Sequence, residues 1–439
     1  MKRNWVLGFV FVLILSGGIG FAQEPEGPLS LEESIRIALD RNLKLQIATA
    51  GVAGSAFRQN SALTQFFPTW TGQYGYVRYD SPTTIGSVSS SAGRGIIVPT
   101  SRDTYGFGTT VNQPLFAGGS ISANYRSESI GVDLSRSNVE TAKRDIVFQV
   151  RQGYFNILTA QKIVEVAEQA VKQFVAQLEV AKAFFEVGIV AKNDVLQAEV
   201  RLANAKQAQV KADNAVALSK SQFNSLLRRE INAPLTVVDI LDYKPSGYTI
   251  EGSLEEAIRQ RPEIKTAELT IEQAKEAVKI ARSGYFPTIN LAGNYNKTSD
   301  EATLDGHWSE RWTVQGIATL AFSDWWRLGY KVGESKVKVT QAQESKDQVV
   351  DNVILEVKQN YLNMTQAEKN ISVAQVSIDQ AEENVRLNEE RYKYQVATAT
   401  DVLDAVTLLA QARLNYYTAL SDYNIAKAAL ERSMGRMYP

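Results

Sequence analysis

Long stretches of the chain place apolar residues at helical spacing and contain almost no helix-breaking residues. Between 334 and 434 there is neither Gly nor Pro, and between 120 and 187 only Gly131 and Gly153 interrupt the pattern. Because Gly costs about 1 kcal/mol and Pro about 3 kcal/mol inside a helix, this pattern predicts long helices over 120–187 and 330–394. A helix of ~65 residues is ~100 Å long, which is too long for a globular core.

Two further segments read as return helices, over 193–228 and 400–434. In the second of these, apolar residues recur from Val402 to Leu430 at a mean spacing of about 3.5 residues, the coiled-coil value. Many of these positions are Ala, which allows neighbouring helices to approach closely. The pattern also fits an antiparallel coiled coil with a structural role, so helices alone do not define the function.

Four segments alternate between apolar and polar residues, as strands with one apolar face do. In the first, Trp70 and Tyr74 alternate with Thr71 and Gln73. Such stretches of ~10 residues are typical of outer-membrane strands, with Tyr and Trp near their ends, and a soluble antiparallel sheet gives a similar pattern. Long Ser/Gly-rich segments within each pair favour the membrane interpretation. The predicted strands are 68–79, 103–116, 287–297 and 309–322.

The chain is an internal duplication. Residues 30–36 return at 253–259, 66–69 return at 285–288, and 151–156 return at 358–363, which gives offsets of 223, 219 and 207. Each copy is longer than a solenoid repeat and reads as a helix, a strand pair, a long helix and a return helix. The predicted organisation is a signal peptide at 1–22, a first repeat at 23–228, a linker at 229–252 and a second repeat at 253–439.

The N-terminus has the pattern of a secretory signal. Lys2 and Arg3 precede an apolar core, and Gly20 and Ala22 are small residues where signal peptidase cuts. A short membrane anchor is the alternative, but the apolar core is shorter than the ~20 residues of a membrane helix. No later segment is apolar for ~20 residues, so membrane insertion is expected only as a β-barrel.

Composition excludes several classes of function. The net charge is -1, with no Cys, one His and four Met, which argues against nucleic-acid binding, disulfides, a lipidated N-terminus and soft-metal sites. The chain has no nucleophile elbow and no phosphate loop. We therefore expect no enzyme activity, no cofactor and no nucleic-acid partner.

Counting strands predicts the assembly. Four strands cannot close a barrel, and an open edge is unfavourable in lipid, whereas twelve strands from three copies leave a lumen. The predicted fold class is mainly α with membrane β: a trimer with a 12-stranded outer-membrane β-barrel, continued by a long periplasmic α-helical barrel. The alternative is a structural coiled-coil protein of the cell envelope, which the strand pairs argue against.

Six motifs follow one another along the chain: Leu31–Ile35, Gln113–Gly119, Val187–Ala191, Asp194–Leu196, Arg391–Tyr392 and Asp401–Ala405. Together with the features above, they resemble the TolC-like outer-membrane efflux channels, across almost the whole chain from about 29 to 435. The resemblance implies a homotrimer in the outer membrane of a Gram-negative-type envelope. It also implies a periplasmic adaptor, an inner-membrane transporter, and export of small molecules or proteins by efflux or type I secretion.

Two aspartates are candidates for a gate where the long helices turn back. Asp401 and Asp404 are three residues apart, so they share a helical face, and three copies would form two rings of carboxylates. Such rings select cations and can hold one; the resemblance matches both positions to the family's periplasmic aperture. Helix capping is the alternative role for Asp401 and for Asp194, since Asp stabilises a helix N-terminus.

The resemblance also implies a latch that holds the tip closed, with Asp194 and Tyr392 as two of its members. The best-known members of the family carry Arg where this chain has Ala397, so another cation is expected to replace it. The candidates are Lys192, Arg391 and Lys393. The residues expected to contact the adaptor are Val187, Gly188, Val195, Leu196, Gln395, Val402 and Leu403.

Overall fold

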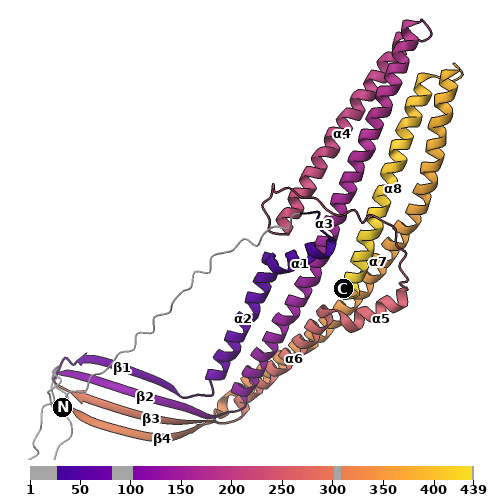
Figure 1. Ribbon diagram of the computed structural model, residues 1–439. Helices are drawn as coiled ribbons and strands as arrows, with labels where there is room; N and C mark the ends of the chain where they lie inside the picture. Colours follow the sequence, from indigo (N-terminus) through magenta and orange to yellow (C-terminus); the bar gives the residue numbers. More distant parts are fainter. Residues whose placement is uncertain (1–26, 82–101, 301–307, 438–439) are drawn as a thin grey trace, which may run out of the picture.

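The computed structural model describes residues 27–81, 102–300 and 308–437, which form one elongated body (Figure 1). A four-stranded sheet lies at one end and two helical hairpins extend to the other. The signal peptide predicted at 1–22 lies outside the described residues.

The helices are α1 Leu31–Arg41, α2 Leu43–Thr64, α3 Ser120–Glu186, α4 Lys192–Leu226, α5 Ile250–Gln260, α6 Pro262–Arg282, α7 Trp325–Lys393 and α8 Ala399–Ser433. The strands are β1 Thr69–Arg78, β2 Asp103–Ala117, β3 Thr288–Ser299 and β4 Ser309–Thr319, with short 3-10 helices at η1 Ser283–Tyr285 and η2 Phe322–Asp324.

The element order repeats once, as two helices, two strands and two long helices. The long helix expected at 120–187 is α3, and the one expected at 330–394 is α7, which begins earlier, at Trp325. Gly329 and Gly333 lie inside α7 without ending it. The segment expected as a linker at 229–252 ends earlier, because α5 begins at Ile250. Across the described ranges, no helix combines the length and apolarity needed to cross a membrane.

α1 and α5, the first helices of the two halves, do not align as the sequence match of residues 30–36 with 253–259 predicts. Ser30 caps α1 by accepting from the Glu33 amide, and Thr249 caps α5 by accepting from the Gly252 amide. Ser34 and Ser253, one turn further on, each donate a hydroxyl hydrogen bond to the carbonyl of that cap residue. The structural offset is therefore 219 residues, and the predicted offset of 223 is wrong by four. Four residues are about one helical turn, so the apolar faces align almost equally well in either register.

The strands form one antiparallel sheet in the order β1-β2-β3-β4. The two hairpins of the duplication meet through β2 and β3, where Thr109 lies opposite Tyr295. A bulge between Pro114 and Phe116 interrupts this register, as expected where Pro lacks an N–H to donate. β1 and β4 form the two edges of the sheet, and every residue of both strands is exposed.

The main apolar core lies midway along the body, where helices of both halves meet the segment between α4 and α5. Tyr154 of α3 is fully buried, and its hydroxyl donates to the carbonyls of Leu29 at 3.0 Å and Val238 at 2.8 Å. Burial raises the pKa of Tyr154 to about 12. The single hydroxyl hydrogen of Tyr154 is thus shared between carbonyls of two separate segments, and it fixes the connecting segment against the start of the chain.

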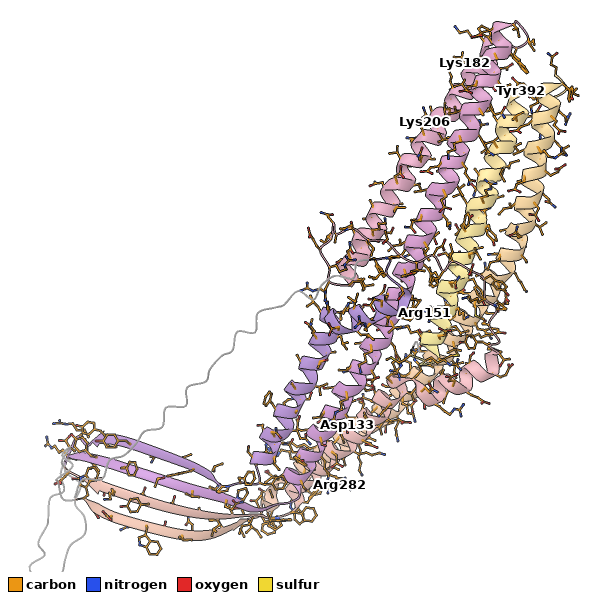
Figure 2. The ribbon with its side chains drawn as sticks, viewed as in Figure 1. Asp133, Arg151, Lys182, Lys206, Arg282 and Tyr392 are labelled. Carbon is orange, nitrogen blue, oxygen red and sulfur yellow. The ribbon has the colours of Figure 1, made fainter. Side chains whose placement is uncertain are left out.

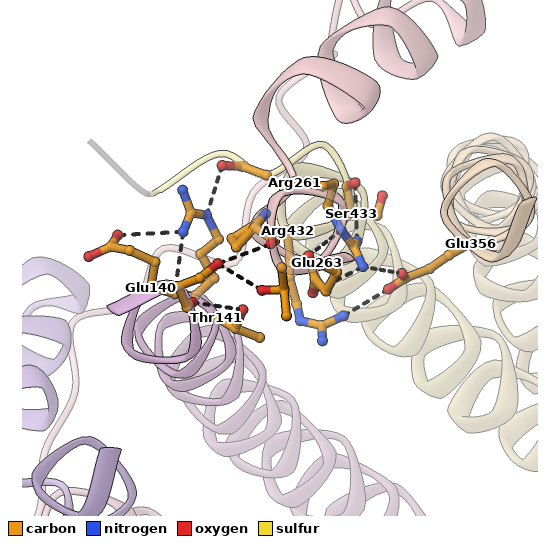
Figure 3. A network of polar contacts seen from close by, with 12 residues as sticks. Glu140, Thr141, Arg261, Glu263, Glu356, Arg432 and Ser433 are labelled. Carbon is orange, nitrogen blue, oxygen red and sulfur yellow. Dashed lines mark hydrogen bonds and ion pairs between the residues drawn. The ribbon is translucent and has the colours of Figure 1, made fainter. Parts of the chain in front are cut away.

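An arginine network joins the end of α8 to both halves (Figure 3). Arg432 donates to Asp145 of α3 at 2.7 Å and to Glu356 of α7 at 2.8 Å. Arg261, whose side chain is 6% exposed, binds Glu356 at 2.8 Å and the Ser433 carbonyl at 3.2 Å. Because a buried guanidinium requires partners for its donors, this network fixes the orientation of α8 relative to α3 and α7.

The joint between the sheet and α3 depends on Gly118. Gly118 and Gly119 both have positive φ, at 61° and 85°, but only Gly118 approaches another backbone. A Cβ on Gly118 would lie 2.3 Å from the Ser283 carbonyl oxygen in η1, whereas a Cβ on Gly119 would meet nothing within 4 Å. The close approach between the turn after β2 and η1 of the other half therefore requires a residue without a side chain at position 118.

We expect Gly118→Ala to destabilise the protein more than Gly119→Ala. Both variants place a Cβ at positive φ, which costs about 1–2 kcal/mol, and Gly118→Ala adds overpacking of about 1–3 kcal/mol. The midpoints of thermal unfolding of both variants in detergent measure the difference. Equal midpoints would contradict the close contact at Ser283.

Candidate gate at the helical tips

The two hairpins turn at the end of the body remote from the sheet. Figure 2 shows Lys182 near the tip of α3 and Tyr392 near the tip of α7. The two turns follow the same plan: Gly188 has φ 74° and Gln395 has φ 60°. The amide of the next residue then bonds back to a helix carbonyl, from Ile189 to Phe184 at 2.9 Å and from Val396 to Arg391 at 2.8 Å. This is the Schellman motif that ends many helices.

The second turn carries backbone strain that the first does not. The left-handed region costs a residue with a Cβ about 1–2 kcal/mol, and Gly avoids this cost. Gln395 therefore adopts a conformation that its packing and hydrogen bonds must hold. The resemblance places Gly at this turn in many members of the family, so this chain ends α7 without the usual residue.

An apolar cluster closes the tip of the protomer. It joins both hairpins, because Val180 and Phe184 come from α3 whereas Tyr392 and Val402 come from α7 and α8. The rings of Phe184 and Tyr392 are 5.4 Å apart between centroids. Ala397, the position of the missing latch arginine, is a partly buried member of the same cluster. In this chain, Ala397 therefore contributes an apolar contact at the position where the resemblance implies a positively charged Arg.

Tyr392 is 4% exposed, and its hydroxyl has no hydrogen-bond partner within the part of the chain that the structure describes. Burial, together with the nearby charge of Asp194, raises the pKa of this hydroxyl. The two predicted latch residues are therefore close enough to interact electrostatically, and no hydrogen bond joins them. A buried hydroxyl without a partner costs about 1–3 kcal/mol.

Asp401 takes part in capping α8, which was the alternative to a role in the gate. It forms a capping box with Thr398, the N-cap residue of this helix. Its carboxylate accepts from the Thr398 amide and hydroxyl, both at 2.8 Å, and the Thr398 hydroxyl accepts from the Asp401 amide at 3.2 Å. The amide and hydroxyl of Thr398, and more weakly the charge of Arg391, lower the pKa of Asp401. At the corresponding cap of α4 stands Ala191, which has no side-chain hydrogen bond, so Asp194 is not in a capping box.

Asp404 is held by an arginine that the sequence pattern did not single out. Arg201 of α4 donates to Asp404 of α8 at 2.6 Å, and both side chains are about half exposed. Nearby, the Thr400 hydroxyl donates to the Gln197 side chain at 2.7 Å. These two contacts join α4 to α8, and therefore the first hairpin to the second. Arg201 lies a whole sequence repeat from Asp404, so only the folded structure reveals the pair.

The residues predicted to contact an adaptor divide into two groups. Val187 and Leu196 are exposed, and Gly188 and Gln395 lie in the turns. Three others are core residues, so we correct their predicted role: their side chains pack inside the protomer. These are Val195 at 9% exposed, Val402 at 1% and Leu403 at 2%.

Three apolar side chains at the turns are exposed, although the predicted contact set omitted them. They are Ile189 at 45%, Tyr394 at 81% and Val396 at 66% exposed. Their position directly beside positive-φ residues is the signal that could have identified them.

No group of three or more His, Cys, Asp or Glu residues in the described ranges is placed to hold a metal ion.

The sheet at one end and the paired hairpins that continue from it define the fold of an elongated subunit, and the comparison with known families gives its class. The chain belongs to the outer membrane efflux protein family, whose model matches residues 34–227 and 253–436. The two matched ranges correspond to the two halves of the duplication.

Known proteins of this class are similar over most of the chain. It is 23% identical to the outer membrane protein TolC of Escherichia coli over 68% of its own length and 63% of that protein. It is also 23% identical to the outer membrane efflux protein BepC of Brucella suis, over 94% of its length and 87% of that protein. The structure of the Campylobacter jejuni CmeC outer membrane channel superimposes with a TM-score of 0.78, at 17% identity, over 99% of this chain and 94% of that one.

The predicted family and outer-membrane location are thereby confirmed, as is the predicted mainly α fold with a duplicated half and a small antiparallel sheet. The family and these relatives are channel proteins rather than enzymes. The matched part spans about two thirds of TolC.

We expect Tyr392→Phe to retain or raise the thermal stability of the helical hairpins. The substitution removes a buried hydroxyl without a partner and keeps the ring against Phe184, so a gain of up to about 1 kcal/mol follows. Tyr392→Ala is the control, because losing the ring costs about 3–5 kcal/mol. Thermal unfolding followed by helical circular dichroism distinguishes the two. A clear loss of stability in Tyr392→Phe would show that the hydroxyl does bond within the closed tip.

Proposed function

We propose that this protein is the subunit of a homotrimeric outer-membrane duct that passively exports small molecules or proteins and is gated at its helical tips. The observation that carries the proposal is the four-stranded sheet with two open edges, from which the hairpins continue (Figure 1). Three such sheets supply twelve strands, enough for a barrel with a lumen. The long hairpins would extend the lumen into the periplasm.

The surface of the sheet supports a membrane setting. Trp70 is 78% exposed, Trp312 74% and Val314 65%, all on the two edge strands. Large exposed apolar side chains on an edge strand favour aggregation of a soluble protein, whereas lipid or a neighbouring strand covers them in a barrel. This observation disfavours the alternative of a structural coiled-coil protein of the envelope.

The partners follow from the family resemblance and from the exposed turns. A duct without an energy source depends on a transporter in the inner membrane, and a periplasmic adaptor would connect the two. In the proposed complex, the adaptor contacts the apolar turn residues around Gly188 and Gln395. The cargo, small molecule or protein, is determined by that transporter.

The carboxylates at the tip would form the aperture. Asp401 and Asp404 are both exposed in the protomer, and three copies would bring six carboxylates around one axis. Arg201 neutralises part of this charge, because it is paired with Asp404. In place of the missing arginine at Ala397, we propose that Arg201 supplies the positive charge of the latch. Lys192, Arg391 and Lys393 were the predicted substitutes, and among them Arg391 influences the pKa of Asp401.

We expect the purified protein in planar bilayers to show a small conductance that a trivalent cation on the periplasmic side blocks. The double variant Asp401→Asn/Asp404→Asn should conduct more and be blocked less, because the carboxylate rings that bind the cation are removed. Asp213→Asn is the matched control, since Asp213 is an exposed aspartate of α4 away from the tip. Unchanged block in the double variant would refute the aperture, and absence of both conductance and a trimer in detergent would refute the duct.

We expect Arg201→Ala to increase the open fraction of the channel. An exposed ion pair contributes about 0.2–1 kcal/mol, so three pairs contribute about 0.6–3 kcal/mol to the closed tip. The control is Lys182→Ala, because Lys182 pairs with Glu199 at 3.6 Å within the first hairpin and does not join the two hairpins. Single-channel recording measures both variants. An equal effect of the two substitutions would assign the change to surface charge rather than to the latch.

A further inference from the structure

A cleft of about 780 Å³ lies between α2, α3 and the junction of α5 with α6. Both halves of the duplication line it, because α2 and α3 belong to the first half and α5 and α6 to the second. Clefts that bind small molecules have volumes of about 300–1,000 Å³. This cleft lies away from both the hairpin turns and the sheet, so neither the gate nor the membrane setting explains it.

The side of α2 that lines the cleft is built from small residues, unlike the equivalent side of α6. Ala53 and Ala56 line the cleft. With the offset of 219 residues, their equivalents on α6 are Glu272 and Lys275. Two long charged side chains of the second half are therefore methyl groups in the first half, which opens space beside α3 and gives this space an apolar wall.

An ion pair fills the equivalent place in the second half. Val139 of α3 and Thr49 of α2 both line the cleft. Their equivalents, at offsets of 207 and 219 residues, are Lys346 of α7 and Glu268 of α6, whose charged groups pair at 2.9 Å. The second half thus joins these two helices by charge, whereas the first half has a cleft with an apolar wall at the corresponding place.

The cleft is basic as well as apolar. Five basic side chains line it, against the two acids Asp133 and Glu140. Three of the five are already paired with acids, and these are Arg136, Arg144 and Arg261. The other two, Arg259 and Lys265 at the α5–α6 junction, form no ion pair with an acid of the described chain. The cleft therefore has two positive charges available for an anionic ligand.

We propose that this cleft binds a single-chain amphipathic anion, a molecule with one acyl chain and an anionic head group. Arg259 and Lys265 bind the head group, and the acyl chain lies along the apolar wall of Ala53, Ala56 and Val139. The N-terminal end of α6 lies at the same junction, and its helix dipole also favours an anion. The site is contained in one protomer, so it goes beyond the proposed duct and does not depend on the trimer.

Native mass spectrometry of the purified protein in a neutral detergent tests the site, because it measures the mass added to each chain. Titration with palmitate should show one saturable site per chain. Hexadecanol, which has the same chain without a charge, should bind about tenfold more weakly, because it loses two partly exposed ion pairs. Palmitoyl lysophosphatidate is the second anionic probe, and the tighter of the two anions identifies a free fatty acid or a lysophospholipid as the source of the head group.

A charge variant tests the head-group position. Arg259→Gln/Lys265→Gln should weaken palmitate binding about tenfold and leave hexadecanol binding unchanged. Lys206→Gln/Lys211→Gln is the matched control, because both are exposed lysines of α4. Figure 2 shows Lys206 toward the tips, whereas Asp133, which lines the cleft, lies nearer the sheet. The control should bind palmitate as the unchanged protein does.

A filling variant tests the position of the acyl chain. Ala53→Glu/Ala56→Lys gives α2 the residues that α6 carries at the equivalent positions, so it should abolish binding of both palmitate and hexadecanol. Circular dichroism checks that the variant keeps its helices. If it does not fold, the charge variant alone decides, because Arg259 and Lys265 are both exposed.

The outcomes separate clearly. Binding of either anion that the cleft variants reduce and the α4 control retains supports the site. Equal binding by the unchanged protein and the charge variant overturns it, as does the absence of a saturable site for both anions. Hexadecanol bound as tightly as the anions overturns the anionic ligand, and a folded filling variant that still binds palmitate overturns the placement of the chain. A monomer by light scattering would contradict the proposed trimer and leave the cleft site intact.

Discussion

The sheet ends in two edge strands, and within the described chain β1 and β4 each have a strand partner on one side only. Unpaired backbone groups are costly in lipid, where no water can satisfy them. The rest of the structure depends on this need to pair the backbone groups of β1 and β4. A sheet that needs a strand partner on both edges also sets the spacing of the long helices that continue from its strands. The network around Arg261 and Arg432 then joins α3, α7 and α8 midway along the body, so the helices of both halves leave the sheet in one fixed orientation.

Much of the architecture follows from local patterns in the sequence. The long helices are predictable because Gly is rare and Pro is absent over segments that no globular core could accommodate, and the strands because their period-two alternation differs from helical spacing. The alignment of α1 with its equivalent α5 in the second half is not predictable from such patterns. Ser30 corresponds to Thr249 rather than to Ser253, and a shift of one turn leaves the apolar face of a short helix almost unchanged. Only the cap hydrogen bonds distinguish the two registers.

The tip was predictable in position and less so in chemistry. The sequence locates the turns and places Val402 on an apolar seam, yet it indicates neither that Gln395 adopts positive φ nor that Leu403 is buried, because both depend on packing between distant helices. Arg201 illustrates the same limit, since its partner Asp404 lies on a helix of the other repeat. Asp401 could be assigned a role in capping or in the gate, and the structure shows that it caps α8 while its carboxylate stays exposed.

The duplication makes the six junctions of the proposed trimer equivalent in backbone but not in charge. Inside a protomer, α4 and α8 are joined by Arg201 and Asp404. With the offset of 207 residues, the same positions between protomers are Leu408 and Gln197, which form no ion pair. In the proposed trimer, three junctions therefore have an ion pair at this position, and three have a Leu and a Gln there. Because exposed ion pairs weaken as salt screens them, rising ionic strength weakens the Arg201–Asp404 pair and has no such pair to weaken between Leu408 and Gln197.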